Sequence, residues 1–430
     1  MKRTIVLMLM VGFVLSAFAG GQDEAGETAS QKTIVLRGVW MENERKDVMK
    51  ATAVAFESQN PNVEVDVDET VPEKLLATLA AKQPIHLIWA NDIDVGTFAD
   101  KGMVVDLGER YMKNDGGVAA WEKKMSPAPV KPLMWKGEGP YMVATYWLVM
   151  LSWMNMDILR DNGLELPQLG WTPDDLAKMS EKVSRDTNND GQNDFFGLDG
   201  EKANSSGLWW FLPNIFGSES LLPPGNKPST INNSSALEAL TWLTEMGSKG
   251  FSAPKSLTME SGKIMYTSEG SYRIPAYQKI GLDCEPAAPL TKKATVSNGY
   301  SGGFFIVKST QDVEDVCWEF IKVASEPKWQ IEFAKQAGFA PLDAGFNSPE
   351  GRDFLTSAAE NEKTKRHWKV FQEFGKYGTA PYPNVPNVWS IIGDIVDPLI
   401  EAAVAGKMDP AEVLAEMEKQ VNEVAEPYFN

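Results

Sequence analysis

The segment IHLIWAND (residues 85–92) starts as a continuous apolar run and ends in an indole, an amide and a carboxylate. It is preceded by a β-branched strand (32–40), a helical pattern (44–57), a strand of alternating valines (63–67) and a second helix (73–82). Strands and helices in this order require right-handed crossovers and a mainly parallel sheet. We therefore expect an α/β fold with a ligand site beyond the carboxyl ends of the strands.

The end of this strand carries side chains suited to sugar recognition. Trp89, Asn91 and Asp92 follow one another closely. An indole covers the flat C–H face of a sugar, and a carboxylate accepts hydrogen bonds from hydroxyls, each contributing about 1.5–3 kcal/mol. Trp40, which ends the first strand, is expected at the same edge. The alternative is a core tryptophan beside a solvated aspartate.

The composition is that of an acidic globular protein. The chain has 430 residues, of which 43% are hydrophobic and 23% charged, and this excludes disorder over its whole length. The length predicts two domains. With 41 Lys and Arg against 59 Asp and Glu, the net charge is −18. Such a charge repels phosphate backbones and anionic lipids, which argues against nucleic acids and membrane surfaces as partners.

The N-terminus has the pattern of a secretory signal peptide. Lys2 and Arg3 precede an apolar run and the sequence Ala-Phe-Ala. That run is too short to span a bilayer, because a transmembrane helix needs about 20 apolar residues. We expect residues 1–19 to be a cleaved signal peptide and residues 20–32 a flexible leader. The mature protein is then periplasmic or otherwise extracytoplasmic.

Two cysteines are present in this exported chain. Export permits a disulfide between Cys284 and Cys317. However, Cys317 lies on the apolar face of a helical pattern, which favours buried free thiols. A zinc site is not indicated, because His86 and His367 are isolated and show no ligand spacing.

The segment DTNNDGQND resembles a calcium-binding loop. Positions 1, 3, 5 and 9 of such a loop are filled by Asp186, Asn188, Asp190 and Asp194. Position 12, where a bidentate Glu belongs, is Gly197. Two interpretations remain open, namely a structural calcium ion and a metal-free turn of Asp, Asn and Gly residues.

The sequence GYSGG matches the nucleophile motif of esterases. A hydrolase of that kind would use Ser301 with His367 and one of two aspartates, Asp343 or Asp353. The motif joins a strand to a helix, whereas residues 304–308 have the pattern of a strand. The paired glycines instead indicate close approach of the backbone to a ligand or a hinge.

Ordered segments of the chain resemble the extracellular solute-binding proteins of sugar-uptake ABC transporters, the maltose-binding-protein-like group. Residues 87–107 resemble the third strand and following helix of this family, where Trp89 and Asp92 match sugar-contacting positions. In the segment 260–273, Tyr272 takes the place of an aromatic platform. Further similar segments, in the family's order, are 55–67, 152–178, 302–310, 313–330, 337–342 and 380–389.

The resemblance implies a two-lobed periplasmic-binding-protein fold (type II). Each lobe is expected to hold a mainly parallel sheet flanked by helices, with a ligand cleft between the lobes. The expected segments are 33–147 and 290–337 for lobe I, and 148–289 and 338–430 for lobe II. The apolar, uncharged run 141–155 is expected to cross between them. The expected hinges lie at 146–148, 288–290 and 338–341.

The resemblance also implies a function. We expect the substrate-binding component of an ABC importer, a monomer that closes by hinge motion over a sugar or oligosaccharide and delivers it to a membrane permease. No catalysis is expected, and no cofactor other than the calcium ion considered above. The alternatives are a binder of a non-sugar solute such as a polyamine and an exported carbohydrate-active or ester hydrolase. The expected ligand-binding residues are Trp40, Trp89, Asn91, Asp92, Tyr272, Arg273, Trp209, Trp210, Tyr300 and Trp389.

Overall fold

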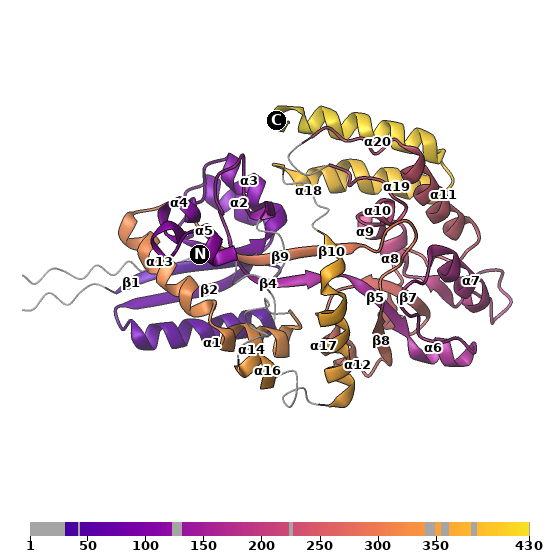
Figure 1. The fold of residues 1–430 in the computed structure, drawn as a ribbon, viewed down its shortest axis with the longest axis horizontal. Helices are drawn as coiled ribbons and strands as arrows, with labels where there is room; N and C mark the ends of the chain where they lie inside the picture. The colour runs from indigo at the N-terminus through magenta and orange to yellow at the C-terminus, as the bar shows by residue number, and fades with distance from the viewer. Residues whose placement is uncertain are drawn as a thin grey trace, which may run out of the picture.

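The protein has two lobes, each built around its own sheet (Figure 1). The computed structural model describes residues 31–41, 44–122, 131–222, 227–339, 349–353, 361–379 and 385–429. The predicted signal peptide and nearly all of the predicted leader lie outside these residues.

The sheet of lobe I is parallel where its strands alternate with helices. Its strands are β1 (Lys32–Val39), β2 (Val63–Thr70), β3 (Leu87–Asn91), β4 (Val143–Val149), β9 (Ser297–Ile306) and β10 (Gly378–Thr379). β1 lies between β2 and β3 and runs parallel to both, which confirms the arrangement predicted from the sequence. β9 runs antiparallel to β3 on one side and to β4 on the other.

The sheet of lobe II has the order β6-β7-β5-β8. Its strands are β5 (Leu151–Asn155), β6 (Phe196–Leu198), β7 (Ile264–Glu269) and β8 (Cys284–Ala287). Here the sheet departs from the expected mainly parallel pattern, because β5 enters from lobe I and runs antiparallel to both β7 and β8. The predicted crossing run forms β4 and β5, which belong to different sheets and are separated by Met150. The chain returns to lobe I between β8 and β9.

Helices flank both sheets (Figure 1). Around the first sheet they are α1 (Glu44–Gln59), α2 (Pro72–Ala80), α3 (Val95–Asp100), α4 (Leu107–Arg110), α5 (Val118–Glu122), α13 (Gln311–Ala324), α14 (Pro327–Ala337) and α16 (Pro349–Asp353). Around the second they are α6 (Met156–Asp161), α7 (Pro173–Val183), α8 (Gly200–Ala203), α9 (Ser206–Trp209), α10 (Leu212–Ile215), α11 (Ser234–Ser248), α12 (Arg273–Ile280) and α17 (Glu362–Phe374). The short turns are η1 (Asp92–Asp94), η2 (Met112–Asn114), η3 (Lys131–Leu133), η4 (Met259–Ser261) and η6 (Gly375–Tyr377).

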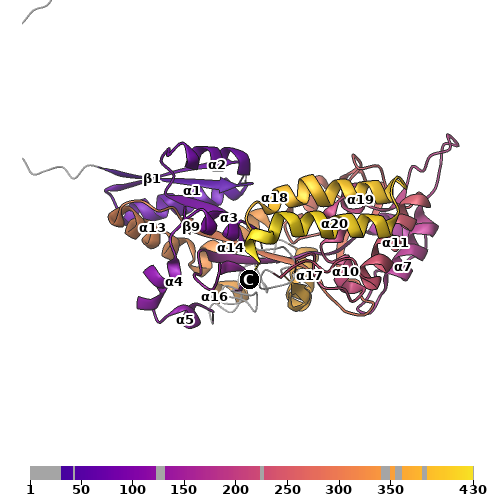
Figure 2. The same cartoon turned by 90° about the horizontal axis from the view of Figure 1, so that it is seen from above.

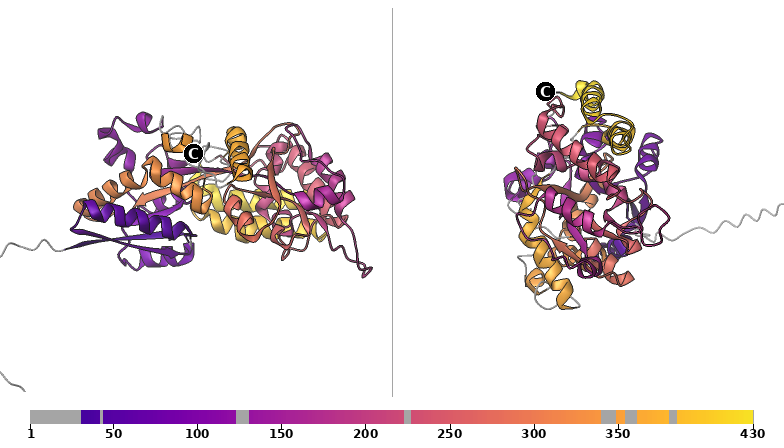
Figure 3. Two further views of the ribbon diagram at one scale, coloured as in Figure 1. Left: turned by 90° about the horizontal axis from the view of Figure 1, so that it is seen from below. Right: turned by 90° about the vertical axis from the view of Figure 1, so that its right-hand side faces the viewer.

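The C-terminal elements belong to lobe II. They are α18 (Val388–Ser390), the π-helical η7 (Ile391–Val396), α19 (Asp397–Val404), α20 (Pro410–Ala425) and η8 (Glu426–Tyr428). α19 and α20 pack against α11, while α18 reaches toward lobe I (Figure 2). The C-terminal helices and α17 lie on opposite sides of lobe II (Figure 3).

The apolar spacing of α1 places one of its faces against the core. Val48, Met49, Ala53 and Phe56 are all buried. The ring of Phe56 meets Phe320 of α13 edge to face, with 5.4 Å between the ring centroids. α1 and α13 therefore cover the lobe I sheet together, although they are far apart in the sequence.

The paired glycines of β9 are explained by strand packing. A Cβ atom on Gly303 would lie 1.9 Å from the carbonyl oxygen of Val143 in β4, and one on Gly302 would lie 2.1 Å from the hydroxyl of Tyr146. The expected close approach is thus between two strands and a tyrosine, which only glycine permits at this spacing.

Both cysteines are buried and unpaired, as predicted. Burial raises the pKa of the Cys284 thiol to about 12, and burial also raises that of Cys317. None of the helices in the described part of the chain combines the length and apolar character needed to cross a bilayer.

Candidate ligand-binding site

The carboxyl ends of β1 and β3 form one edge of the lobe I sheet. Gly38 pairs with Trp89 in the parallel register, so Trp40 and Asn91 end neighbouring strands at the same level. Trp40 is 47% exposed and has a φ of 57°. Its carbonyl oxygen accepts a hydrogen bond from the guanidinium of Arg45. A bulky residue in the left-handed region is a backbone outlier of the kind found at functional sites.

Two buried carboxylates lie at this edge. Asp92 and Asp94 are only 4% and 5% exposed. Burial raises the pKa of Asp92 to about 7, although the amide of Ser301, 2.9 Å from Oδ2, favours its ionised form. Burial also raises the pKa of Asp94 to about 6. No described Lys, Arg or His side chain forms an ion pair with either group. Beside them, Oδ1 of Asn91 accepts a hydrogen bond of 2.8 Å from the Tyr146 hydroxyl.

An aromatic cluster joins this edge to lobe II. The ring of Phe339 lies 6.0 Å from Trp89, 4.4 Å from Tyr146 and 6.3 Å from Tyr272. Trp89 stacks on Phe333 at 5.7 Å and is only 2% exposed. Trp89 and Tyr272 therefore both contact the ring of Phe339. The structure also encloses Trp89 in the core, so this ring presents no face to a ligand in this conformation.

Tyr272 and Arg273 hold a buried carboxylate. The Tyr272 hydroxyl donates to Glu269, Nη2 of Arg273 lies 2.8 Å from Glu269, and Nζ of Lys202 lies 3.4 Å from it. Although burial opposes ionisation, the charges of Lys202 and Arg273 hold the pKa of Glu269 below its ordinary value. Nη1 of Arg273 pairs with Glu260. The guanidinium of Arg273 is therefore engaged within lobe II.

Trp389 supplies the second exposed indole. The structure describes all fourteen tryptophans, and only Trp40 and Trp389 are exposed, by 47% and 40%. Trp389 belongs to α18, and its indole nitrogen donates a hydrogen bond of 2.9 Å to Oδ1 of Asp94. The two exposed indoles thus lie on different lobes, and both are tied to the same edge of the lobe I sheet.

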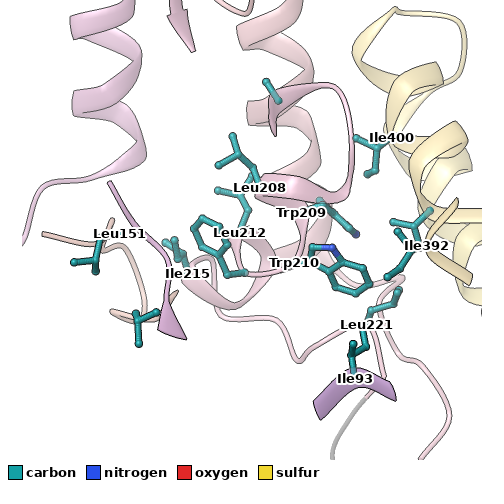
Figure 4. Packing of buried hydrophobic residues seen from close by; sticks show 14 of the residues in the cluster. Ile93, Leu151, Leu208, Trp209, Trp210, Leu212, Ile215, Leu221, Ile392 and Ile400 are labelled. Carbon is teal, nitrogen blue, oxygen red and sulfur yellow. The ribbon is translucent and has the colours of Figure 1, made fainter. Parts of the chain in front are cut away.

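The remaining expected residues contribute less to this site. Trp209 and Trp210 are 1% and 6% exposed, and they pack in the hydrophobic core with Ile392 (Figure 4). These two indoles offer almost no surface to a ligand in this conformation. Tyr300 is half-buried in β9. It lies close enough to Tyr272 that the negative charge of an ionised Tyr300 would raise the pKa of the Tyr272 hydroxyl further.

In the loop that resembles a calcium site, side-chain carboxylates accept hydrogen bonds from the loop's own backbone amides. Oδ1 of Asp186 accepts from the amides of Asn188 and Asn189, and Oδ1 of Asp190 accepts from the amide of Gln192. Among the described residues, no three His, Cys, Asp or Glu side chains converge closely enough to hold a metal ion. Asp194 bonds the amide and hydroxyl of Thr187. These contacts are those of an Asx turn.

The esterase motif lacks the geometry of a nucleophile elbow. Ser301 lies inside β9 and is 1% exposed, with no helix following it. His367 belongs to α17, and its Nε2 lies 3.0 Å from Glu285 of β8 in lobe II. Asp353 is in α16, and Asp343 lies outside the described residues. The hydrolase arrangement is therefore not formed around Ser301 by the described residues.

Comparison with known proteins decides the family. Residues 51–361 match the family described as bacterial extracellular solute-binding protein. The chain belongs to this family. An extracellular location accords with the family's description.

Solved structures share the fold of this solute-binding protein at low identity. The ABC substrate-binding protein Lmo0181 from Listeria monocytogenes, in complex with cycloalternan, has 17% identity and a TM-score of 0.76, covering 93% of this chain and 100% of that one. The maltose/maltodextrin-binding domain MalE from Bdellovibrio bacteriovorus, bound to maltotriose, has 17% identity and a TM-score of 0.73, covering 92% and 100%. The cyclic alpha-maltosyl-1,6-maltose binding protein from Arthrobacter globiformis has 17% identity and a TM-score of 0.74, and the match covers 92% of this chain and 99% of that one. These likenesses confirm the two-lobed fold.

Several residues of this solute-binding protein's candidate site were not singled out from the sequence. Asp94 lies two residues beyond Asp92, in the strand-end segment that was expected to face a ligand, so position alone could have identified it. Phe339 and Glu269 carried no such signal. Their roles depend on contacts between segments that are distant in the chain.

Proposed function

We propose that this solute-binding protein is the exported substrate-binding component of an ABC importer, and that it binds a sugar or oligosaccharide between its lobes. One observation carries the proposal. Trp40 of lobe I and Trp389 of lobe II are the two exposed indoles; Trp389 donates to the buried carboxylate of Asp94, and Trp40 ends the strand next to the one that Asp92 and Asp94 follow.

The chemistry of these groups suits a carbohydrate. An indole face packs on the C–H side of a sugar ring. Asp92 and Asp94 are buried in this conformation, and their carboxylate oxygens accept hydrogen bonds from hydroxyls once separation of the lobes gives a ligand access to them. A dissociation constant of 1 μM requires about −8 kcal/mol. Two stacked indoles and a few charge-assisted hydrogen bonds, at about 1.5–3 kcal/mol each, supply this amount. The cycloalternan, maltotriose and cyclic maltosyl-maltose ligands of the structural neighbours support this ligand class.

The two crossings support binding by hinge closure. The chain passes between the sheets from β4 to β5 and again from β8 to β9, so each lobe is built from separate segments. A ligand that contacts both lobes favours the closed arrangement by its extra contacts there. The closed protein then delivers the sugar to a membrane permease. The protein acts as a monomer, performs no catalysis, and reaches the cell exterior through its signal peptide.

Isothermal titration of the mature chain against a panel of oligosaccharides, monosaccharides and spermidine tests the proposal. We expect at least one sugar to bind with a micromolar or lower dissociation constant, while spermidine does not bind. Binding of spermidine without any sugar would contradict the proposal and favour a polyamine binder. Chromatography after prolonged incubation provides the second readout, since shorter products would indicate an enzyme.

A further inference from the structure

The contact between Asp94 and Trp389 joins the two lobes. Asp94 ends η1 of lobe I, and Trp389 lies in α18 of lobe II, 295 positions further along the chain. Their hydrogen bond is supported next to it, where the amide of Asn387 lies 3.2 Å from Oγ1 of Thr97. Asp94 and Thr97 are both 5% exposed. The acceptors of both contacts are therefore buried on the lobe I side, whereas Trp389 itself is 40% exposed.

Apolar contacts continue this junction. Ile93, the residue before Asp94, belongs to the same buried hydrophobic cluster as Leu221, Trp210 and Ile392 of lobe II, and Figure 4 draws these side chains in one region. Ile93 and Ile392 are 4% and 8% exposed. The lobes thus meet along η1 through packed side chains as well as hydrogen bonds.

Another contact between the lobes is of a weaker kind. Nζ of Lys279 in α12 lies 3.1 Å from Glu44 of α1, and their side chains are 76% and 47% exposed. Exposed ion pairs of this sort contribute little, because water and salt screen them. The hydrogen bond from the Trp389 indole to Asp94 is a stronger contact, since its acceptor is a buried carboxylate and a charged acceptor in a low dielectric binds its donor more tightly.

The surroundings of Asp94 make Trp389 its decisive partner. The indole N–H is the largest influence favouring ionised Asp94, followed by the amide of Asn91. No described cationic side chain pairs with it, and the nearby Asp92 is also acidic. Opening the lobes at this junction exposes Asp94 to water but breaks its hydrogen bond with the indole.

We propose that Asp94 is a positioning residue whose hydrogen bond to Trp389 is a latch between the lobes that forms without ligand. The latch fixes the exposed indole beside the sheet edge, and it favours the closed arrangement before a sugar arrives. This second consequence rests on the proposed function, because it matters only if the lobes close over a ligand. When part of the unliganded protein is already closed, less of the binding free energy is spent on closing the lobes, so the sugar binds more tightly.

Small-angle X-ray scattering of the unliganded mature chain tests the latch. Trp389→Phe keeps an aromatic ring but removes the N–H donor, so it should increase the radius of gyration. Asp94→Ala should do the same, and the double variant should open no further than either single variant. Asp94→Asn retains an oxygen that accepts from the indole and should stay as compact as the wild type. Trp329→Phe, in α14, serves as the matched control.

The result that would overturn the latch is a Trp389→Phe variant that is folded by circular dichroism and keeps the radius of gyration of the wild type. Trp389→Phe decides the matter alone if Asp94→Ala does not fold. With the sugar identified by titration, the opened variants should bind about ten- to a hundredfold more weakly, as expected for a hydrogen bond to a charged group. If no sugar binds, the proposed function fails, whereas the scattering of the unliganded protein still decides the latch.

Discussion

Burial of Asp92 makes the stability of the unliganded protein depend on pH in a predictable direction. The pKa of this carboxyl rises from 3.8 to about 7 because the group is buried. Between these values the folded chain binds more protons at Asp92 than the unfolded chain does. The stabilisation linked to this group is therefore complete below pH 3.8 and is lost as the pH rises through 7.

The size of the effect follows from the same two pKa values. Each unit of difference corresponds to about 1.4 kcal/mol when the pH lies between them. From pH 5 to pH 8, Asp92 should therefore lower the free energy of unfolding by about 2–3 kcal/mol. Burial raises the pKa of Asp94 to about 6, which adds a smaller loss of the same sign.

Urea denaturation at pH 5, 6, 7 and 8, followed by tryptophan fluorescence, measures this dependence. The variant Asp92→Asn keeps an oxygen that accepts from the Ser301 amide but cannot ionise. Its free energy of unfolding should fall less than that of the wild type as the pH rises, by about 2–3 kcal/mol over the range. The exposed Asp115 gives the matched control, Asp115→Asn. If the wild type and Asp92→Asn have parallel pH profiles, the argument from burial is refuted.

Three further substitutions test the site and the fold. Trp40→Ala should weaken sugar binding by more than about tenfold, the loss of one stacked indole, with little change in melting temperature, as titration and a thermal melt would show. Trp89→Ala should lower the free energy of unfolding by about 3–5 kcal/mol in urea, because Trp89 stacks on Phe333 in the core. Gly303→Ala should cost at least about 3 kcal/mol by the same measurement, since the new Cβ would lie 1.9 Å from the carbonyl oxygen of Val143. An unchanged affinity for the first, or unchanged stability for either of the others, would contradict these assignments.

The fold was predictable where the evidence in the sequence is local. Alternating strand and helix patterns over residues 32–91 determine the order of elements, and the crossover rule then gives the parallel pairing of β1, β2 and β3. The same local pattern cannot show that β5 enters its sheet from the other lobe. That is why the antiparallel pairing in lobe II was not anticipated.

The sequence could predict which residues end the strands at the candidate site, but not the exposure of each side chain. The sequence places Asn91, Asp92 and Asp94 at the end of β3, and the structure shows that both aspartates are buried there. Both faces of a sheet flanked by helices are buried, so periodicity could not tell that Trp89 faces Phe333 rather than a ligand. Nor could it show that Trp389, 295 positions from Asp94, shares that edge.

Fluorine NMR of the protein labelled with 5-fluorotryptophan shows whether the two exposed indoles contact the bound sugar. The signals of Trp40 and Trp389 are assigned by replacing each with Phe, and the core residue Trp153, which is 0% exposed, provides an internal reference. Saturation with the bound sugar should shift the Trp40 and Trp389 signals and leave that of Trp153 in place. Tight sugar binding that leaves both exposed indoles unshifted would contradict the account.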